Sequence, residues 1–180
     1  MPMTDEESLF AAIHESVALH AHDASWAARF VNERDRLTAL FPGLFVDIQH
    51  IGSTAVCGLV AKPIIDLLAG VESMAVAASL SPALCKAGYS TSAEFNAALT
   101  DRQWFMRWAN GRRTHHLHVV VHGGSVWNQR LGFRDALRAS AALRERYAAL
   151  KSSLAALHPN DREAYTDAKA GFIRAVTAGG

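Results

Sequence analysis

The sequence predicts an α/β or α+β fold, in which a small mixed sheet flanked by helices precedes a helical C-terminal half. Short apolar runs alternate with turn residues in the middle of the chain, as strands do. After Gly124 the apolar positions recur at the helical spacing instead. We expect residues 1–180 to form a single domain, with the sheet core at about 16–122 and the helical part at about 124–178.

The first part of the chain is expected to hold two helices and two strands. Thr4-Asp5-Glu6-Glu7 is typical of a capping box that opens a short helix. The segment 16–20 is either the end of that helix or a brief strand. A second helix begins near Ser25 and stops at Phe41-Pro42-Gly43, because proline and glycine end helices. The apolar patterns that predict strands follow at 44–51 and 63–71.

One more helix and a hairpin are expected before the helical tail. Residues 73–87 have a helical pattern that is interrupted near Ser81-Pro82. The segments 103–108 and 114–121 alternate as strands do, and Asn110-Gly111 between them is a turn signal. Together these strands would complete a sheet of four or so strands.

The helical tail breaks once, at Pro159-Asn160-Asp161, and we expect Asn160 together with Glu163 to cap the last helix. Trp127, Leu131, Arg134 and Arg138 follow one another at helical spacing. Two pairs in the tail place a lysine four residues after a tyrosine: Tyr147 with Lys151, and Tyr165 with Lys169. A lysine in an apolar stripe either extends to the surface or points into a polar cleft, and both interpretations stay open.

The composition is that of an ordinary globular protein, since half of the residues are hydrophobic and 19% are charged. No apolar stretch approaches the roughly 18 residues of a membrane span, and the acidic start does not resemble a secretory signal. Cys57 and Cys85 are too few for a disulfide framework. We expect them to be buried free thiols and the protein to be cytoplasmic, with no membrane as a partner.

The net charge of +1 conceals an asymmetry, because residues 1–90 carry −5 and residues 91–180 carry +6. A basic half attracts anions such as phosphates. Solvated helix faces explain the counts equally simply. The basic residues are scattered among acids, so nucleic acid is an unlikely partner.

The first candidate site is the segment from His50 to Val71. Gly52 lets the backbone approach a ligand closely, and Ser53 and Thr54 offer N–H and hydroxyl donors that can cradle a phosphate. Asp66 then stands in the apolar run Ile64-Ile65-Asp66-Leu67-Leu68, where an unpaired charge would cost free energy. Lys62 could bind phosphate, pair with Asp66, or remain solvated.

The second candidate site is the strand that contains Thr114-His115-His116-Leu117-His118. Alternation places His116, His118, Val120 and His122 on one face, and His115, Leu117, Val119 and Val121 on the other, which is typical of a core. A His-x-His pair on one face can grip a metal ion or contact a phosphate. A half-exposed strand with polar outward residues is the simpler alternative.

The order of these segments resembles the signature blocks of the GrpB-like family over about 17–173. The blocks are HIGSTAVCGLVAKPIIDLLAGV, HHLHVV, LGFRDALR and DREAYTDAKAGFI, together with the tryptophan and the Tyr-Lys pair between them. The family belongs to the nucleotidyltransferase superfamily, whose fold is similar to the catalytic domain of DNA polymerase beta. Some relatives are fused to a dephospho-coenzyme A kinase, which implies a link to coenzyme A biosynthesis.

The resemblance implies roles for the candidate residues. Gly52 and Ser53 would contact nucleotide phosphates, and Asp66 would be the first metal-binding carboxylate. The superfamily places a second acid where this chain has Leu68, and a third on the strand where this chain has His116 and His118. Family members usually read Ala-Val-Pro-Gly where this chain has Cys57 before Gly58, which adds a thiol near the site.

We therefore expect a metal-assisted nucleotidyltransferase that acts on a nucleotide and an unknown acceptor. Asp66, His116 and His118 would be catalytic or metal-binding, with magnesium or manganese as the cofactor and zinc as an alternative. The phosphates would be bound by Gly52, Ser53, Thr54, Lys62, Arg113, Lys151 and Lys169. The alternatives are a non-catalytic nucleotide-binding or regulatory domain of the same fold, and a metal-dependent hydrolase that uses Asp66 and the His-x-His pair.

Overall fold

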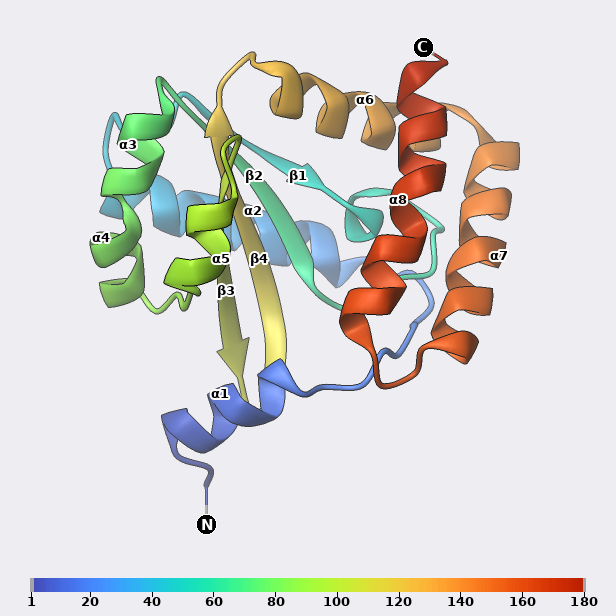
Figure 1. Ribbon diagram of the computed structural model, residues 1–180, viewed down its shortest axis with the longest axis horizontal. Helices are drawn as coiled ribbons and strands as arrows, with labels where there is room; N and C mark the ends of the chain where they lie inside the picture. The colour runs from blue at the N-terminus through green and yellow to red at the C-terminus, as the bar shows by residue number, and fades with distance from the viewer. Residues whose placement is uncertain (1, 180) are drawn as a thin grey trace.

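A computed structural model describes residues 2–179, so Met1 and Gly180, the ends of the expected domain, lie outside it (Figure 1). Its strands are β1 (Asp47–Ile51), β2 (Ile65–Val71), β3 (Gln103–Ala109) and β4 (Arg112–Val121). Its helices are α1 (Asp5–Ile13), α2 (Ser25–Leu40), α3 (Met74–Ser79), α4 (Ser81–Lys86), α5 (Ala93–Ala98), α6 (Ser125–Ala139), α7 (Ala141–Leu157) and α8 (Arg162–Ala178). A short 3-10 helix, η1 (Ser53–Ala55), follows β1.

The strands form one mixed sheet in the order β1-β2-β4-β3, as the predicted fold class requires. β2 runs parallel to β4 and antiparallel to β1, and β3 pairs with β4 as the predicted hairpin. The register places Asp66 between two neighbours, Ile51 on β1 and His116 on β4. The carboxylate therefore lies near the beginning of β2, beside the end of β1 and the middle of β4.

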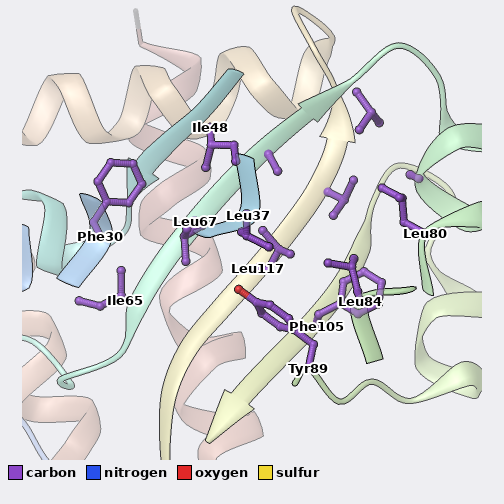
Figure 2. Close-up of a cluster of buried hydrophobic side chains, with 14 of the residues drawn as sticks. Phe30, Leu37, Ile48, Ile65, Leu67, Leu80, Leu84, Tyr89, Phe105 and Leu117 are labelled. Carbon is purple, nitrogen blue, oxygen red and sulfur yellow. The ribbon is translucent and has the colours of Figure 1, made fainter. Parts of the chain in front are cut away.

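One face of the sheet carries the main hydrophobic core. Leu67, Leu117 and Phe105 are fully buried there, and α2, α3 and α4 supply apolar side chains that cover them. Figure 2 shows this cluster, with Phe30 of α2 at one end, Leu80 at the other, and Leu37 of α2 between them. Residues that alternate with these, including Asp66, face the opposite side, where α6, α7 and α8 lie (Figure 1).

The opposite face has a smaller apolar cluster, in which Leu68 and Val120 pack against Ile51 and Trp127. Leu68 is completely buried. The position at which the superfamily has its second acid is therefore part of the hydrophobic packing between the sheet and α6.

A buried carboxylate fastens α2 to β3 and to the loop after α4. Glu33 is 4% exposed and accepts hydrogen bonds from Arg36, from Arg107 at 2.6 Å and from the hydroxyl of Tyr89 at 2.6 Å. Two cations and a phenol satisfy its oxygens, so Glu33 is a structural group.

Several expected boundaries are confirmed. Thr4 and Glu7 form the capping box of α1, and the interruption near Ser81-Pro82 separates α3 from α4. The strand expected over 44–51 is shorter, because its ladder begins at Asp47. Of the segment 16–20, only His20 makes a β-bridge, to Ala61.

Other expectations were wrong. Asp161, and not Asn160, caps α8, since its Oδ1 accepts from the N–H of Ala164 at 2.9 Å. The tail has a second break at Ser140, which ends α6 and caps α7. Cys57 and Cys85 are free, but they are exposed and not buried, because one lies in a turn and the other on the outer side of α4. No helix among residues 2–179 is long and apolar enough to cross a membrane.

Candidate functional site

The site begins with close contact between a turn and a carboxylate. Gly52 follows β1 with φ 72° and ψ −175°, a backbone conformation that is essentially restricted to glycine. A Cβ atom on this residue would lie 2.5 Å from Oδ2 of Asp66. The turn can therefore lie against the Asp66 carboxylate only because residue 52 has no side chain.

Two imidazoles approach the other oxygen of the same carboxylate. Oδ1 of Asp66 lies 3.5 Å from Nδ1 of His116 and 3.5 Å from Nε2 of His118. These separations are longer than an optimal hydrogen bond, so the contacts are loose. The Asp66 side chain is 27% exposed, which leaves the carboxylate accessible from outside the protein. The structure thus brings together the three residues that the sequence singled out.

The hydrogen bonds around the imidazoles indicate their protonation. Nη1 of Arg113 lies 3.4 Å from Nε2 of His116, and a guanidinium can only donate, so the ring proton of His116 lies on Nδ1, facing Asp66. Burial lowers the pKa of His118 to about 4, and it lowers the pKa of His116 as well, although Asp66 opposes both shifts. Both rings are therefore neutral at pH 7.

Asp66 is ionised at that pH. Burial alone would raise the pKa of its carboxyl, but hydrogen bonding to His116 and His118 outweighs burial and holds the pKa well below its usual range. The site therefore contains one carboxylate and two neutral imidazoles.

Three lysines interact electrostatically with the carboxylate of Asp66: Lys62, Lys151 and Lys169. Burial lowers the pKa of Lys62 to about 7, of Lys151 to about 7 and of Lys169 to about 8. Lys169 also lowers the pKa of Lys62 and of Lys151, while Asp66 raises the pKa of all three. Lys151 is 2% exposed and donates to the carbonyl oxygen of Val60. Neither Lys151 nor the partly buried Lys169 extends to the surface. Of the two interpretations left open for the Tyr-Lys pairs, the lysines therefore follow the one in which they point into a polar region of the fold.

The tyrosine rings of these pairs make cation–π contacts with the ammonium groups. Nζ of Lys169 lies 4.5 Å from the ring centre of Tyr165, and Nζ of Lys62 lies 5.0 Å from the same centre. Nζ of Lys151 lies 5.2 Å from the ring of Tyr147. Because residues four apart share a helix face, the spacing in α7 and α8 directs each lysine over its own tyrosine.

Two arginines that the sequence did not single out complete the group. Burial is the main cause of the lowered pKa of His118, and the charge of Arg130 in α6 lowers this pKa further. Arg130 also interacts with the charge of Asp66. Arg162 begins α8 and interacts with Lys62 and Lys169. Its Nε and Nη1 are buried with no hydrogen-bond partner among residues 2–179, although Nη2 lies 3.5 Å from Glu15. Arg130 is four residues before Arg134, and Arg162 is three residues before Tyr165. This helical spacing from residues that were singled out is the signal in the sequence that could have identified the two arginines.

We call the six basic side chains the cationic cluster. Its members come from the loop before β2, from β4 and from the three C-terminal helices: Lys62, Arg113, Arg130, Lys151, Arg162 and Lys169. Asp66 lies among them, and Glu15 contacts two of them, through the N–H of Arg113 and the guanidinium of Arg162. Positive charge thus exceeds negative charge in a partly desolvated region, which is the electrostatic signature of an anion site.

The remaining predicted residues lie in the turn, and they differ in what they contact. Ser53 lies near Tyr147. Thr54 is buried, and its Oγ1 lies 2.9 Å from Nε2 of His50 and 3.4 Å from the carbonyl oxygen of Ile64. The hydroxyl of Thr54 is therefore engaged within the fold.

The described residues do not form the three-ligand metal centre that the sequence predicts. Across residues 2–179, no group of three or more His, Cys, Asp or Glu side chains is arranged to hold a metal ion. A third protein ligand would require movement of the imidazoles, whereas Asp66 and one imidazole already lie close together.

A small mixed sheet with a glycine-serine turn beside an aspartate-bearing strand defines the nucleotidyltransferase-like class of α/β domains. The chain belongs to the GrpB family, because the family model described as GrpB protein matches residues 16–178. It is 38% identical to the glutamate-rich protein GrpB of Alkalihalophilus pseudofirmus, over 87% of this chain and 91% of that protein. The crystal structure of GrpB from Enterococcus faecalis is similar, with a TM-score of 0.79 and 30% identity over 90% of this chain and 96% of that one.

Another similar protein is about twice as long as the region that it shares with this chain. The chain is 32% identical to a protein of Mycobacterium leprae named dephospho-CoA kinase, over 88% of this chain and 45% of that protein. A similar chain therefore occurs within a larger polypeptide that bears this name.

Proposed function

We propose that the protein binds the phosphates of a nucleotide at the cationic cluster and transfers a nucleotidyl group from it to an acceptor. The observation that carries the proposal is that Lys62, Arg130, Lys151 and Lys169 all interact with Asp66, next to the turn at Gly52 and Ser53. The other two members of the cluster, Arg113 and Arg162, interact with Lys62. A triphosphate carries several negative charges at pH 7, and so it complements the positive excess better than a single carboxylate would.

The low lysine pKa values support a polyanionic ligand. The pKa of Lys151 is about 7 because its ammonium group is buried among other cations. A phosphate beside it would favour the charged form and raise this pKa. Binding would thus relieve repulsion that the ligand-free protein contains.

A divalent ion fits this site best when it arrives with the nucleotide. Magnesium commonly binds through one or two carboxylates, with substrate phosphates and water completing its shell. Asp66 and His118 can supply the protein's share, because Oδ1 of Asp66 lies 3.5 Å from Nε2 of His118. Neighbouring ligands of an octahedral ion at about 2.1 Å lie roughly 3.0 Å apart, so the two groups would have to move closer by roughly 0.5 Å. When bound, the ion would neutralise phosphate charge and orient the attacking group.

The same site supports a second candidate function, nucleotide binding without transfer. Leu68 occupies the position of the second acid and is fully buried in the cluster with Trp127. A two-metal reaction would therefore lack one of its usual ligands. This observation favours a regulatory domain that has retained the phosphate site.

The names of two relatives, both dephospho-CoA kinase, suggest the metabolic context of the phosphorylated ligand. They add support for a nucleotide-containing small molecule and for a functional link to coenzyme A biosynthesis. A nucleotide substrate is also in keeping with the predicted cytoplasmic location.

The test is calorimetric titration of the four nucleoside triphosphates, and of coenzyme A precursors, with and without Mn²⁺. Lys62→Met and Lys169→Met keep the length of the side chain and remove the charge, and Lys86→Met is a matched control on the exposed side of α4. We expect about ten-fold weaker binding for each cluster variant, a loss of roughly 1.4 kcal/mol, and no change for the control. Affinity should also fall as salt rises.

Turnover assays then separate the alternatives. Release of pyrophosphate together with a modified acceptor supports transfer, and nucleotide binding without product supports the regulatory domain. Hydrolysis without an acceptor supports the metal-dependent hydrolase. Absence of binding to every nucleotide and precursor, in protein shown to be folded, would overturn the proposal.

A further inference from the structure

A second hollow lies on the other side of β1 from Asp66. It occupies about 340 Å³ between α2, β1 and α6, and we call it the α2–α6 cavity. Phe30 and Val31 of α2, Ile48 and His50 of β1, and Arg134 and Arg138 of α6 are among the side chains that line it. This volume lies within the range of small-molecule sites, toward its lower end.

The two arginines of the cavity are held in place by the fold. Nη1 of Arg134 donates to Oε1 of Gln49 at 2.8 Å and to the carbonyl oxygen of His50 at 3.1 Å, and this side chain is 11% exposed. Nε of Arg138 donates to the carbonyl oxygen of Ala55 at 3.0 Å. Guanidiniums fixed in this way lose little further freedom when a ligand binds them.

Arg138 keeps binding capacity after these contacts. A guanidinium has five N–H donors in a rigid fork, and this one makes a single hydrogen bond to the described residues, through Nε. Its terminal nitrogens thus remain for a bidentate partner. Nη1 and Nη2 are also the pair that most often grips a carboxylate or a phosphate.

The carboxylate that lines the cavity does not neutralise Arg138. Oδ1 of Asp47 accepts from the N–H of Ile48 at 2.8 Å, and Oδ2 accepts from Nε2 of Gln49 at 2.7 Å. The third lining arginine, Arg34, pairs with the exposed Asp35, outside the cavity. Asp135 pairs with Nε of Arg134 at 2.9 Å, and its charge also acts on Arg138. No carboxylate among the described residues hydrogen-bonds to the terminal nitrogens of Arg138, which therefore stay available to a ligand.

The remaining wall is apolar. The rings of Phe30 and His50 are stacked, with centroids 4.7 Å apart and planes within 7°. Nε2 of His50 is engaged with Thr54, so this imidazole is part of the wall. Ala27, Val31 and Ile48 extend the apolar surface.

We propose that the α2–α6 cavity is a second ligand site, which binds a compact organic anion. The carboxylate or phosphate group of the ligand lies on the terminal nitrogens of Arg138, beside Arg134, and its apolar part lies against Val31 and Ile48. The site is separate from the cationic cluster, because it lies along β1 between α2 and α6 and shares no side chain with the cluster.

The test is an NMR titration of the ¹⁵N-labelled protein with inorganic phosphate and, in a parallel arm, with succinate at matched ionic strength. Backbone amides of Ala27 and Val31 report on the cavity, and the amide of Lys169 reports on the cluster. We expect saturable shifts at Ala27 and Val31, and the tighter of the two arms identifies the anionic group. Shifts that do not saturate, or that occur only near Lys169, would overturn the proposal.

Variants assign the binding to the cavity. Arg138→Gln should weaken the saturation at Ala27 and Val31 by about ten-fold or more, and Arg174→Gln, an exposed arginine of α8, should leave it unchanged. Ala27→Leu fills the cavity from an exposed position without touching the arginines, so it tests the site even where Arg138→Gln disturbs the turn. Undiminished binding in the folded Ala27→Leu protein would contradict the assignment.

Discussion

Oδ2 of Asp66 occupies the place where a side chain on Gly52 would begin, since a Cβ there would lie 2.5 Å from this oxygen. The turn and the carboxylate are therefore a single unit. Any ligand held by the backbone at residues 52–54 also lies beside the charge of Asp66, and movement of one requires movement of the other.

Replacement of Gly52 by alanine should affect both stability and binding. The φ of 72° and ψ of −175° would cost a residue with a side chain on the order of 1–3 kcal/mol, and the new methyl group would displace the carboxylate. We expect a lower melting temperature together with loss of nucleotide binding. Gly58→Ala is the matched control, because Gly58 has φ 79° and nothing within 4 Å of its Cβ position. That variant should lose stability but bind normally, and equal binding by both variants would argue against a ligand at the turn.

The buried lysines predict an unusual dependence of stability on pH. The pKa of Lys151 is about 7 in the folded protein, against about 10.4 in an unfolded chain. Between these values the unfolded state binds more protons, so the free energy of unfolding should rise with pH. From pH 7 to pH 9, Lys151 alone would add roughly 2 kcal/mol, and Lys62 acts in the same direction. Chemical denaturation without phosphate across this range measures the slope.

A variant assigns that slope to the lysine. Lys151→Met should flatten the dependence and should be at least as stable at pH 7, because it replaces a buried cation by an apolar chain of similar length. Lys86→Met, on the exposed side of α4, should retain the slope. If wild type showed no rise between pH 7 and pH 9, Lys151 would have to be charged and paired in the ligand-free protein.

The neighbours of Asp66 could be inferred from the sequence because β structure has a simple periodicity. Alternation fixed which residues of 114–121 share a face, and the apolar run around Asp66 marked a strand that pairs with another in the core. These two regularities are enough to bring Asp66, His116 and His118 together, as the register shows.

The helical contributors were harder to infer. Which face of α6 turns toward the sheet depends on how that helix packs, and the break at Ser140 that reorients the chain depends on a single cap. Arg130 and Arg162 were therefore missed, whereas Lys151 and Lys169 were found through their tyrosines. α5 was missed because six residues are too few to show a helical period.

Restoring the superfamily's second acid should not create activity. Leu68 is fully buried against Ile51, Val120 and Trp127. Leu68→Asp would place an unpaired carboxylate in that cluster, and we expect a loss on the order of 3–5 kcal/mol or failure to fold. Leu68→Met conserves the volume and should cost less than about 1.5 kcal/mol. A stable Leu68→Asp protein with increased metal-dependent turnover would show instead that the site can accept a second ion.

Replacement of Asp66 by asparagine separates its two proposed roles, because the shape is kept and the charge is removed. Asp66 offsets the positive charge of the cluster, so its loss should lower the ligand-free stability at pH 7 by about 1–3 kcal/mol. Asp66 also repels the phosphates of a ligand, so binding of inorganic phosphate in the absence of metal should become several-fold tighter. If Asp66 carries a divalent ion to the nucleotide, the enhancement of nucleotide affinity by Mn²⁺ should disappear in the same variant.

Asp35→Asn is the matched control for these three measurements, since Asp35 is exposed and pairs with the exposed Arg34. Its stability should change by less than about 0.5 kcal/mol, and its response to phosphate and Mn²⁺ should equal that of wild type. Thermal melts and titrations of both variants, with and without Mn²⁺, give the comparison. Weaker phosphate binding by Asp66→Asn would mean that the carboxylate organises the cluster, and an undiminished response to Mn²⁺ would mean that the ion is bound elsewhere.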